Sequence, residues 1–131
     1  MRHIKLLTTD FLAIEYNLVD DFLVGNWAGP LTKEDIVDGY EQISLFLKKQ
    51  FCHKLLDNHL EVQGMWVEQA AWMARDWHPR AEAIGLQYHA CVYSRDIYSR
   101  LSADQAIRMV EKGIVKGFDT ESAAEGWLKA W

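Results

Sequence analysis

The chain has 131 residues, of which 50% are hydrophobic and 25% are charged, and its formal net charge is −5 at pH 7. This length suits one domain, residues 1–131, and the composition excludes an intrinsically disordered chain. The acidic balance without a basic run argues against nucleic acid as the main partner.

No stretch approaches the roughly 20 apolar residues that cross a bilayer, and residues 1–10 lack the apolar core of a secretory signal. We therefore expect a cytoplasmic protein without a membrane span. The cysteines Cys52 and Cys91 lie in or beside apolar extended runs. We expect both to be buried thiols rather than a disulfide.

The N-terminal part of the chain predicts antiparallel strands followed by a helix. Runs rich in β-branched and aromatic residues cover 4–8, 11–17 and 21–27. Asp20-Asp21 has the composition of a hairpin turn. Thr32 followed by Asp35 resembles a capping box, and the helical spacing of the apolar residues after it predicts a helix over 32–50.

The middle of the chain predicts a short strand over 53–57, a polar loop and a second helix. One face of that helix carries Trp66, Ala70, Met73 and Trp77, which we expect to lie in the core. Proline has no backbone N–H, so Pro79 should kink or stop the helix near residues 77–78.

The C-terminal part predicts two more strands, each followed by a helix. The strands cover 86–93 and 115–118. Ser102 with Gln105 is read as the capping box of the first helix. The last helix should bury a stripe of four residues, Ala124, Trp127, Leu128 and Trp131.

Strands that alternate with helices imply strands that run in the same direction, because a parallel pair needs a crossover between its members. The expected fold is therefore an α/β fold. It has a mixed, mostly parallel sheet, an N-terminal antiparallel hairpin and about four helices.

Several segments together resemble the small stand-alone bacterial STAS-like, or SpoIIAA-like, proteins. STAS stands for sulfate transporter and anti-sigma factor antagonist. The segments are GNW at 25–27, GPLTKED at 29–35, LLDN at 55–58, WMARDWHPRAEAIG at 72–85, ACVYS at 90–94 and FDTESAAEGWL at 118–128. The resemblance implies a mixed sheet with helices packed on it, related to the folds of anti-sigma factor antagonists and of CRAL-TRIO lipid binders.

This chain lacks one functional feature of the anti-sigma factor antagonists that it resembles. In those proteins a partner kinase phosphorylates a serine at the start of the helix in the middle of the chain. The corresponding residues here, 57–66, contain no serine or threonine. A phosphorylation switch at that position is therefore excluded.

A candidate ligand site follows from the position of polar residues after the predicted strands. In parallel sheets, ligands bind beyond the carboxyl ends of the strands. An acid, an imidazole and a guanidinium there could hold an anion or move a proton. The stronger interpretation is structural, because the same residue types fill turns and cap helices. The candidate residues are Asp57, Asn58, His59, Ser94, Arg95 and Asp96.

No catalytic or metal-binding motif is present in the sequence. The five histidines form no i, i+4 pair, and neither cysteine belongs to a CxxC pair. GxSxG, GxGxxG and phosphate-binding GKS motifs are also absent. We therefore expect no metal, no cofactor and no catalytic residue, and we do not expect an enzyme.

A candidate interface lies on the helix that follows residue 66. Trp72 lies about 120° from Trp66 around the helix axis and shares a face with Glu68, which leaves a large aromatic side chain partly in water. Such side chains often mark contacts with a partner. Glu68, Trp72 and Arg75 are therefore candidate interface residues. The alternative, that Trp72 packs under residues 80–84 or the N-terminal hairpin, is equally open.

Two functions remain from these observations. The first is a non-catalytic regulatory or protein-interaction module that binds a second copy of itself or another protein. The alternative is a binder of a small amphipathic ligand or lipid, or less plausibly an enzyme acting on one, with a pocket between residues 57–64 and 88–96. We favour the first, because the acidic charge and the lack of catalytic spacing disfavour chemistry without disfavouring binding.

Overall fold

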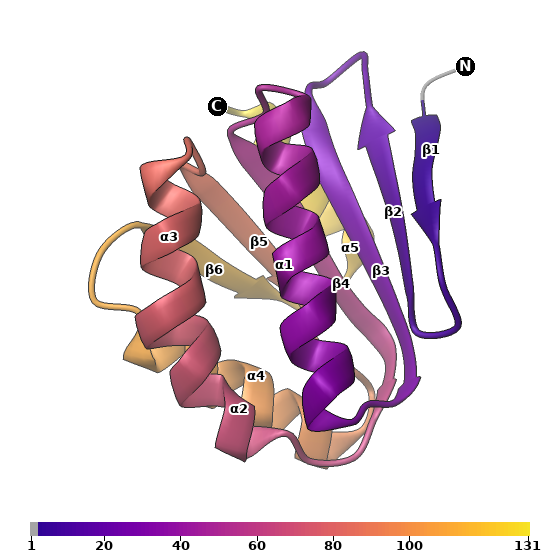
Figure 1. The fold of residues 1–131 in the computed structure, drawn as a ribbon, viewed down its shortest axis with the longest axis vertical. Helices are drawn as coiled ribbons and strands as arrows, with labels where there is room; N and C mark the ends of the chain where they lie inside the picture. Colours follow the sequence, from indigo (N-terminus) through magenta and orange to yellow (C-terminus); the bar gives the residue numbers. More distant parts are fainter. Residues whose placement is uncertain (1–2) are drawn as a thin grey trace.

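A six-stranded β-sheet spans the molecule, with its strands in the order β1-β2-β3-β4-β5-β6 (Figure 1). The computed structural model describes residues 3–131. β1, β2 and β3 pair antiparallel, and β3 to β6 pair parallel. The strands are β1 His3–Thr8, β2 Leu12–Asn17, β3 Phe22–Pro30, β4 Lys54–Gln63, β5 Tyr88–Val92 and β6 Ile114–Phe118.

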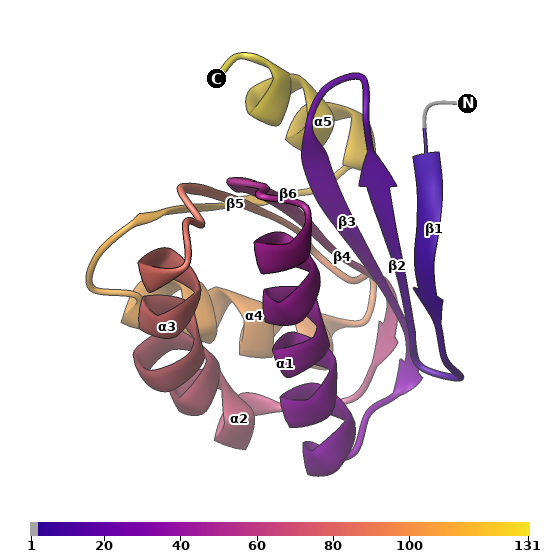
Figure 2. The ribbon, with the colours of Figure 1, turned by 45° about the horizontal axis from the view of Figure 1, so that its top comes forward.

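Four helical segments cover the two faces of this sheet. α1, the segment over 67–83 and α4 lie on one face, and α5 lies on the other (Figure 2). Among residues 3–131, no helix combines the length and the apolar character that a bilayer crossing requires. The helices are α1 Lys33–Lys49, α2 Val67–Trp72, the π-helical η1 Met73–Trp77, α3 His78–Ala83, α4 Ile97–Met109 and α5 Glu121–Lys129.

The predicted fold class is confirmed, including the antiparallel start. Asp21 adopts a left-handed conformation with φ 55° between β2 and β3, where the turn was predicted. Thr32 begins α1, and its side chain accepts the Asp35 N–H while the Asp35 side chain accepts the Thr32 N–H. This reciprocal pair is the predicted capping box.

The helix over 67–83 continues past Pro79 where the sequence predicts a kink or a stop. The His78 N–H donates to the Met73 carbonyl, five residues earlier, so the chain passes through one π-helical turn. Proline removes a backbone donor, and an irregular turn beside it is a common way for a helix to continue. The irregular turn, Met73–Trp77, overlaps the predicted break only at Trp77, and the helix reaches Ala83.

The predicted strand over 53–57 is too short, because β4 extends to Gln63. β3 reaches Pro30 and pairs with β4 from Leu23 opposite Leu55 to Pro30 opposite Gln63, with one irregularity between Asn26 and Ala28. Asp57 and His59 are thus buried in mid-strand. Polar residues in this run suggested a loop, but they find their partners inside the protein.

Two further predictions about the C-terminal half are wrong. α4 begins at Asp96, whose side chain accepts the Tyr98 and Ser99 N–H groups, so Ser102 lies inside the helix and caps nothing. Trp131 is 57% exposed and stacks on Tyr88 rather than joining the core.

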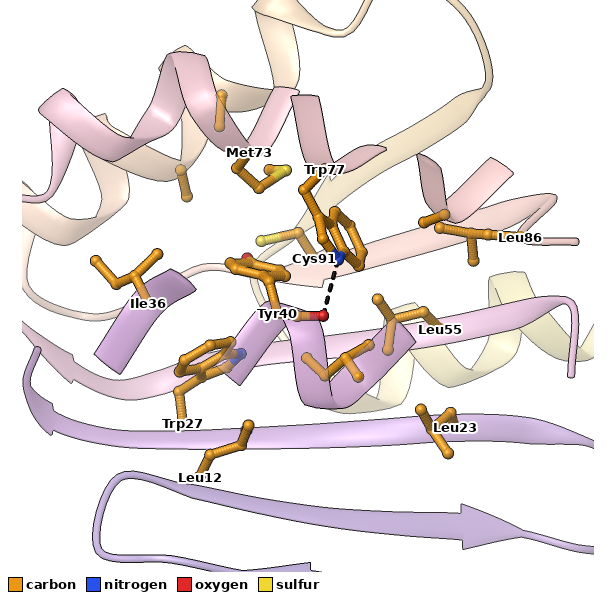
Figure 3. Close-up of a cluster of buried hydrophobic side chains, with 14 of the residues drawn as sticks. Leu12, Leu23, Trp27, Ile36, Tyr40, Leu55, Met73, Trp77, Leu86 and Cys91 are labelled. Atoms are coloured by element: carbon orange, nitrogen blue, oxygen red, sulfur yellow. Dashed lines mark hydrogen bonds between the residues drawn. The ribbon is translucent and has the colours of Figure 1, made fainter. Parts of the chain in front are cut away.

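Aromatic side chains fill the space between α1, the 67–83 helix and the sheet (Figure 3). The Tyr40 ring lies 4.9 Å from that of Trp27 and 4.7 Å from that of Trp77, between ring centroids. Trp77 Nε1 donates to the Tyr40 carbonyl at 2.8 Å, which joins the two helices across the core. Gly39 is buried on α1, and a Cβ at this position would meet the Trp27 ring.

Replacing Gly39 tests this close contact. Alanine normally stabilises a helix, but Gly39→Ala should lower the free energy of unfolding by about 1–3 kcal/mol because the core must shift. Gly126→Ala on α5 is the matched control, since a Cβ there meets nothing within 4 Å. It should raise stability by about 0.5–1 kcal/mol. Urea denaturation measures both, and equal effects would contradict the packing described.

Candidate functional site

A buried carboxylate at the centre of the sheet collects side chains from four elements. Asp57 Oδ1 accepts hydrogen bonds from Trp27 Nε1 at 2.8 Å and His59 Nε2 at 3.0 Å. Oδ2 accepts from the Tyr40 hydroxyl at 2.7 Å and His89 Nε2 at 2.9 Å. The donors come from β3, β4, α1 and β5, and Asp57 itself is 0% exposed.

Strand periodicity explains why these residues meet. Side chains two apart on a strand share a face, so Asp57 and His59 of β4 point to the same side. Asp57 pairs in register with Cys91 of β5, and His89 lies two residues before Cys91. We call the six residues that meet here the Asp57 cluster: Trp27, Tyr40, Asp57, His59, His89 and Cys91.

The electrostatics of the Asp57 cluster favour a buried ion pair. Burial would raise the pKa of Asp57, but the His59 charge and the hydrogen bonds from His59 and His89 outweigh it, so that pKa lies far below its usual range. Burial would lower the pKa of His59, but Cys91 and Asp57 raise it well above its ordinary value. Asp57 is therefore a carboxylate at neutral pH, and its charge favours the protonated form of His59.

Asp57, His59 and Cys91 lie in the order of an acid, an imidazole and a thiol. His59 Nδ1 lies 3.8 Å from Cys91 Sγ, while Nε2 faces Asp57. Nucleophilic catalysis needs a reactive thiolate that a substrate can reach. Cys91 is only 3% exposed, and burial raises the pKa of its thiol. The geometry can hold a proton or a cation, but it offers a substrate no access.

The cavity beside the Asp57 cluster is small. Its volume is about 10 Å³, which is room for about one water molecule. Its lining is mainly apolar, formed by Trp27, Leu31, Ile36, Tyr40, His59, Val62 and Trp66. Ligand pockets typically measure about 300–1,000 Å³, so this space does not hold a lipid or a metabolite.

Of the six candidate ligand residues, the structure brings Asp57 and His59 together in the Asp57 cluster and places the other four elsewhere. Asn58 points to the opposite face of the sheet from Asp57 and His59, and its amide donates to Asn26. Ser94 donates to the Val62 carbonyl and Asp96 caps α4, so both have structural roles. Arg95 is exposed.

Sequence reasoning missed the partners of Asp57 on other elements. Trp27, Tyr40 and His89 lie far from Asp57 along the chain, and only the sheet register and the packing of α1 on the sheet bring them together. The alternation Asp57-x-His59 and His89-x-Cys91 was the available signal, since it places polar groups on one face of adjacent strands. The i, i+4 spacing of histidines detects metal sites on single helices only. It therefore gave no sign of Asp57, His59 and Cys91, which lie on two adjacent strands and whose ligand atoms lie within 4.8 Å of one another.

The three candidate interface residues differ in exposure. Glu68 and Arg75 are exposed, whereas Trp72 is half-buried with its ring 6.4 Å from that of Tyr40. Arg75 lines a surface groove of about 660 Å³ together with Ala74, Pro79, Glu82, Ala83, Glu111 and Lys112.

A second pair of buried histidines adjoins the Asp57 cluster. His78 stacks on His89 with ring centroids 5.3 Å apart, and its Nδ1 hydrogen-bonds to Glu82 at 2.9 Å. His78 Nε2 and His89 Nδ1 have no partner. Burial and the neighbouring His89 lower the pKa of His78 to about 3.

Comparisons with known proteins identify the fold but no activity. No family model matches the sequence, and no curated protein matches it. The chain is similar to the crystal structure of an uncharacterized protein of the DUF3478 family, with a SpoIIAA-like fold, from Shewanella loihica PV-4. That protein is 20% identical, the match covers 96% of this chain and 91% of the other, and the TM-score is 0.52. The chain therefore has the SpoIIAA-like fold that its sequence motifs implied.

The charge on Asp57 can be tested by an isosteric substitution. Asp57→Asn puts an amide N–H₂ among four donors and leaves His59 without its counter-ion, so the free energy of unfolding should fall by about 3–5 kcal/mol. Asp119→Asn is the control, because this exposed carboxylate pairs only with Arg100 at the surface. Asp119→Asn should lower the free energy of unfolding by less than about 1 kcal/mol. Equal losses in urea denaturation would contradict a buried ion pair.

The lowered pKa of His78 predicts acid sensitivity. In the unfolded chain histidine takes up a proton near pH 6.5, whereas folded His78 does so near pH 3. Between these pH values the unfolded state binds more protons than the folded state. The free energy of unfolding should therefore fall by up to about 1.4 kcal/mol for each unit by which the pH is lowered. The titratable groups around His78, which are Asp57, His89 and Glu82, are unchanged in His78→Phe. The unfolding free energy of this variant should decline less steeply between pH 6 and 4 than that of the wild type. Parallel curves for the two proteins would refute the assignment of this acid sensitivity to His78.

Proposed function

We propose that this protein is a non-catalytic interaction module that associates with a second copy of itself. One observation supports this most strongly: large apolar side chains gather in solvent where β4 leads into α2 and where α4 begins. We call them the α4 patch: Met65, Val67, Ile97, Tyr98 and Leu101, which are 57%, 41%, 64%, 56% and 55% exposed.

The α4 patch is continuous rather than a set of scattered residues. Met65, Val67 and Leu101 line the same surface groove, of about 280 Å³. Ile97 lies one helical turn before Leu101 on α4. The Trp66 N–H donates to Ser102 Oγ at 2.8 Å, which fixes the loop before α2 against α4. Clustered apolar side chains on a monomer surface commonly mark a binding site.

Charges beside the α4 patch favour a second copy as the partner. A two-fold interface uses the same surface twice and must therefore be self-complementary. Asp104 and Arg108 line the groove and pair with each other at 2.9 Å, and Glu68 follows Val67 in the sequence. Reversing one copy against another can bring the acids of each copy near the base of the other. Glu68 is shared with the interface predicted from sequence, whereas Trp72 and Arg75 lie further along the helix.

The interior supports binding at the surface rather than catalysis. Asp57, His59 and Cys91 are the residues best suited to chemistry, and each is at most 3% exposed. The adjacent cavity holds about one water molecule. Surfaces that remain accessible are therefore where this protein can act.

A charge placed in the α4 patch tests the proposal. Leu101→Glu should convert a dimer to a monomer, because burying an unpaired carboxylate in an apolar interface is unfavourable. Leu45→Glu is the matched control, since Leu45 is 42% exposed on α1 and lies outside the patch. Size-exclusion chromatography with light scattering measures the mass. A monomeric wild-type protein at all accessible concentrations, or dissociation by both variants alike, would refute self-association through the patch.

A further inference from the structure

We propose that Asp57, His59 and Cys91 form a buried binding site for a divalent metal ion of the zinc class. The three side chains come from adjacent strands and point to one face of the sheet. Their ligand atoms all lie within 4.8 Å of one another. An oxygen, a nitrogen and a sulfur donor form a set that zinc binds readily. This site is independent of self-association through the α4 patch.

The imidazole of His59 lies between the other two side chains. Nε2 lies 3.0 Å from Asp57 Oδ1, and Nδ1 lies 3.8 Å from Cys91 Sγ. An oxygen of Asp57, a ring nitrogen of His59 and the Cys91 sulfur are the three ligand atoms, and they lie within 4.8 Å of one another. Trp27 and Tyr40 hold that carboxylate in place before a metal arrives.

The charge of the site suits a divalent ion in a buried position. A carboxylate, a thiolate and a neutral imidazole carry two negative charges, which a divalent cation cancels. Metal binding therefore leaves no uncompensated charge in the interior, where one would be costly. The Cys91 thiol proton and one His59 proton leave to solvent when the metal binds.

The neighbouring cavity supplies room for an additional ligand. It borders His59 and Tyr40 and has a volume of about 10 Å³, enough for about one water molecule. Zinc sites with three protein ligands commonly complete their coordination with water.

Cobalt(II) provides the test, because a cobalt–thiolate bond absorbs in the near ultraviolet. Reduced protein is mixed with Co²⁺ both in its folded state and during refolding from denaturant, since the site is buried. Wild type should develop the absorption, and Cys91→Ser should lose it with affinity weakened about 10- to 100-fold or more. Cys52→Ser is the control: Cys52 is also buried and free, but its sulfur contacts only backbone carbonyls. This variant should bind like wild type.

A second variant keeps the test decisive if Cys91→Ser fails to fold. His59→Phe keeps an aromatic ring at this position and removes the nitrogen ligand. Zn²⁺ should therefore raise the melting temperature of wild type and of Cys52→Ser but not that of His59→Phe. Absence of the cobalt–thiolate band in wild type under both loading conditions would overturn the proposal. Retention of the band in Cys91→Ser, or its loss in Cys52→Ser, would overturn it equally.

Discussion

The burial of one carboxylate, that of Asp57, is the constraint on which the rest of this structure depends. Removing a carboxylate from water costs several kcal/mol, and that cost is offset only when its lone pairs are filled. Here α1, β3, β4 and β5 each contribute a donor to Asp57. The position of α1 over the sheet is therefore fixed by hydrogen bonds as well as by apolar packing.

The Asp57 cluster also explains the aromatic character of the core. Trp27 and Tyr40 each place a polar group on Asp57 while their rings fill the surrounding apolar space. Trp77 packs against Tyr40 and donates to its backbone, which extends the network to the helix over 67–83. Amphipathic aromatic side chains suit this position because they satisfy buried polar groups without opening a cavity. The resulting interior is closed, and the accessible apolar surface lies instead at the start of α4.

Sequence reasoning predicted the fold more completely than the site. Hydrophobic periodicity and the Thr32 capping box placed α1, and the alternation of strands and helices predicted the parallel sheet. β4 was predicted too short because Asn58 and His59, which follow the predicted strand end at Asp57, look like loop residues when their partners are unknown. Those partners lie 17 to 32 residues away along the chain and meet only through the sheet register and the packing of α1 on the sheet. Local patterns carry no information on such contacts, and for the same reason Asp96 was read as a ligand residue rather than as the cap of α4.

The ionisation of Asp57 can be observed directly in the folded protein. Carbon-13 NMR of the side-chain carboxyl carbons, recorded on metal-free protein as the pH is lowered from neutral, follows each aspartate separately. The Asp57 resonance should not titrate while the protein remains folded, because the pKa of this carboxyl lies far below the usual range of aspartate. Titration of Asp57 near pH 4 in the folded state would contradict it, because the carboxylate would then lack the stabilisation that its four donors are inferred to provide.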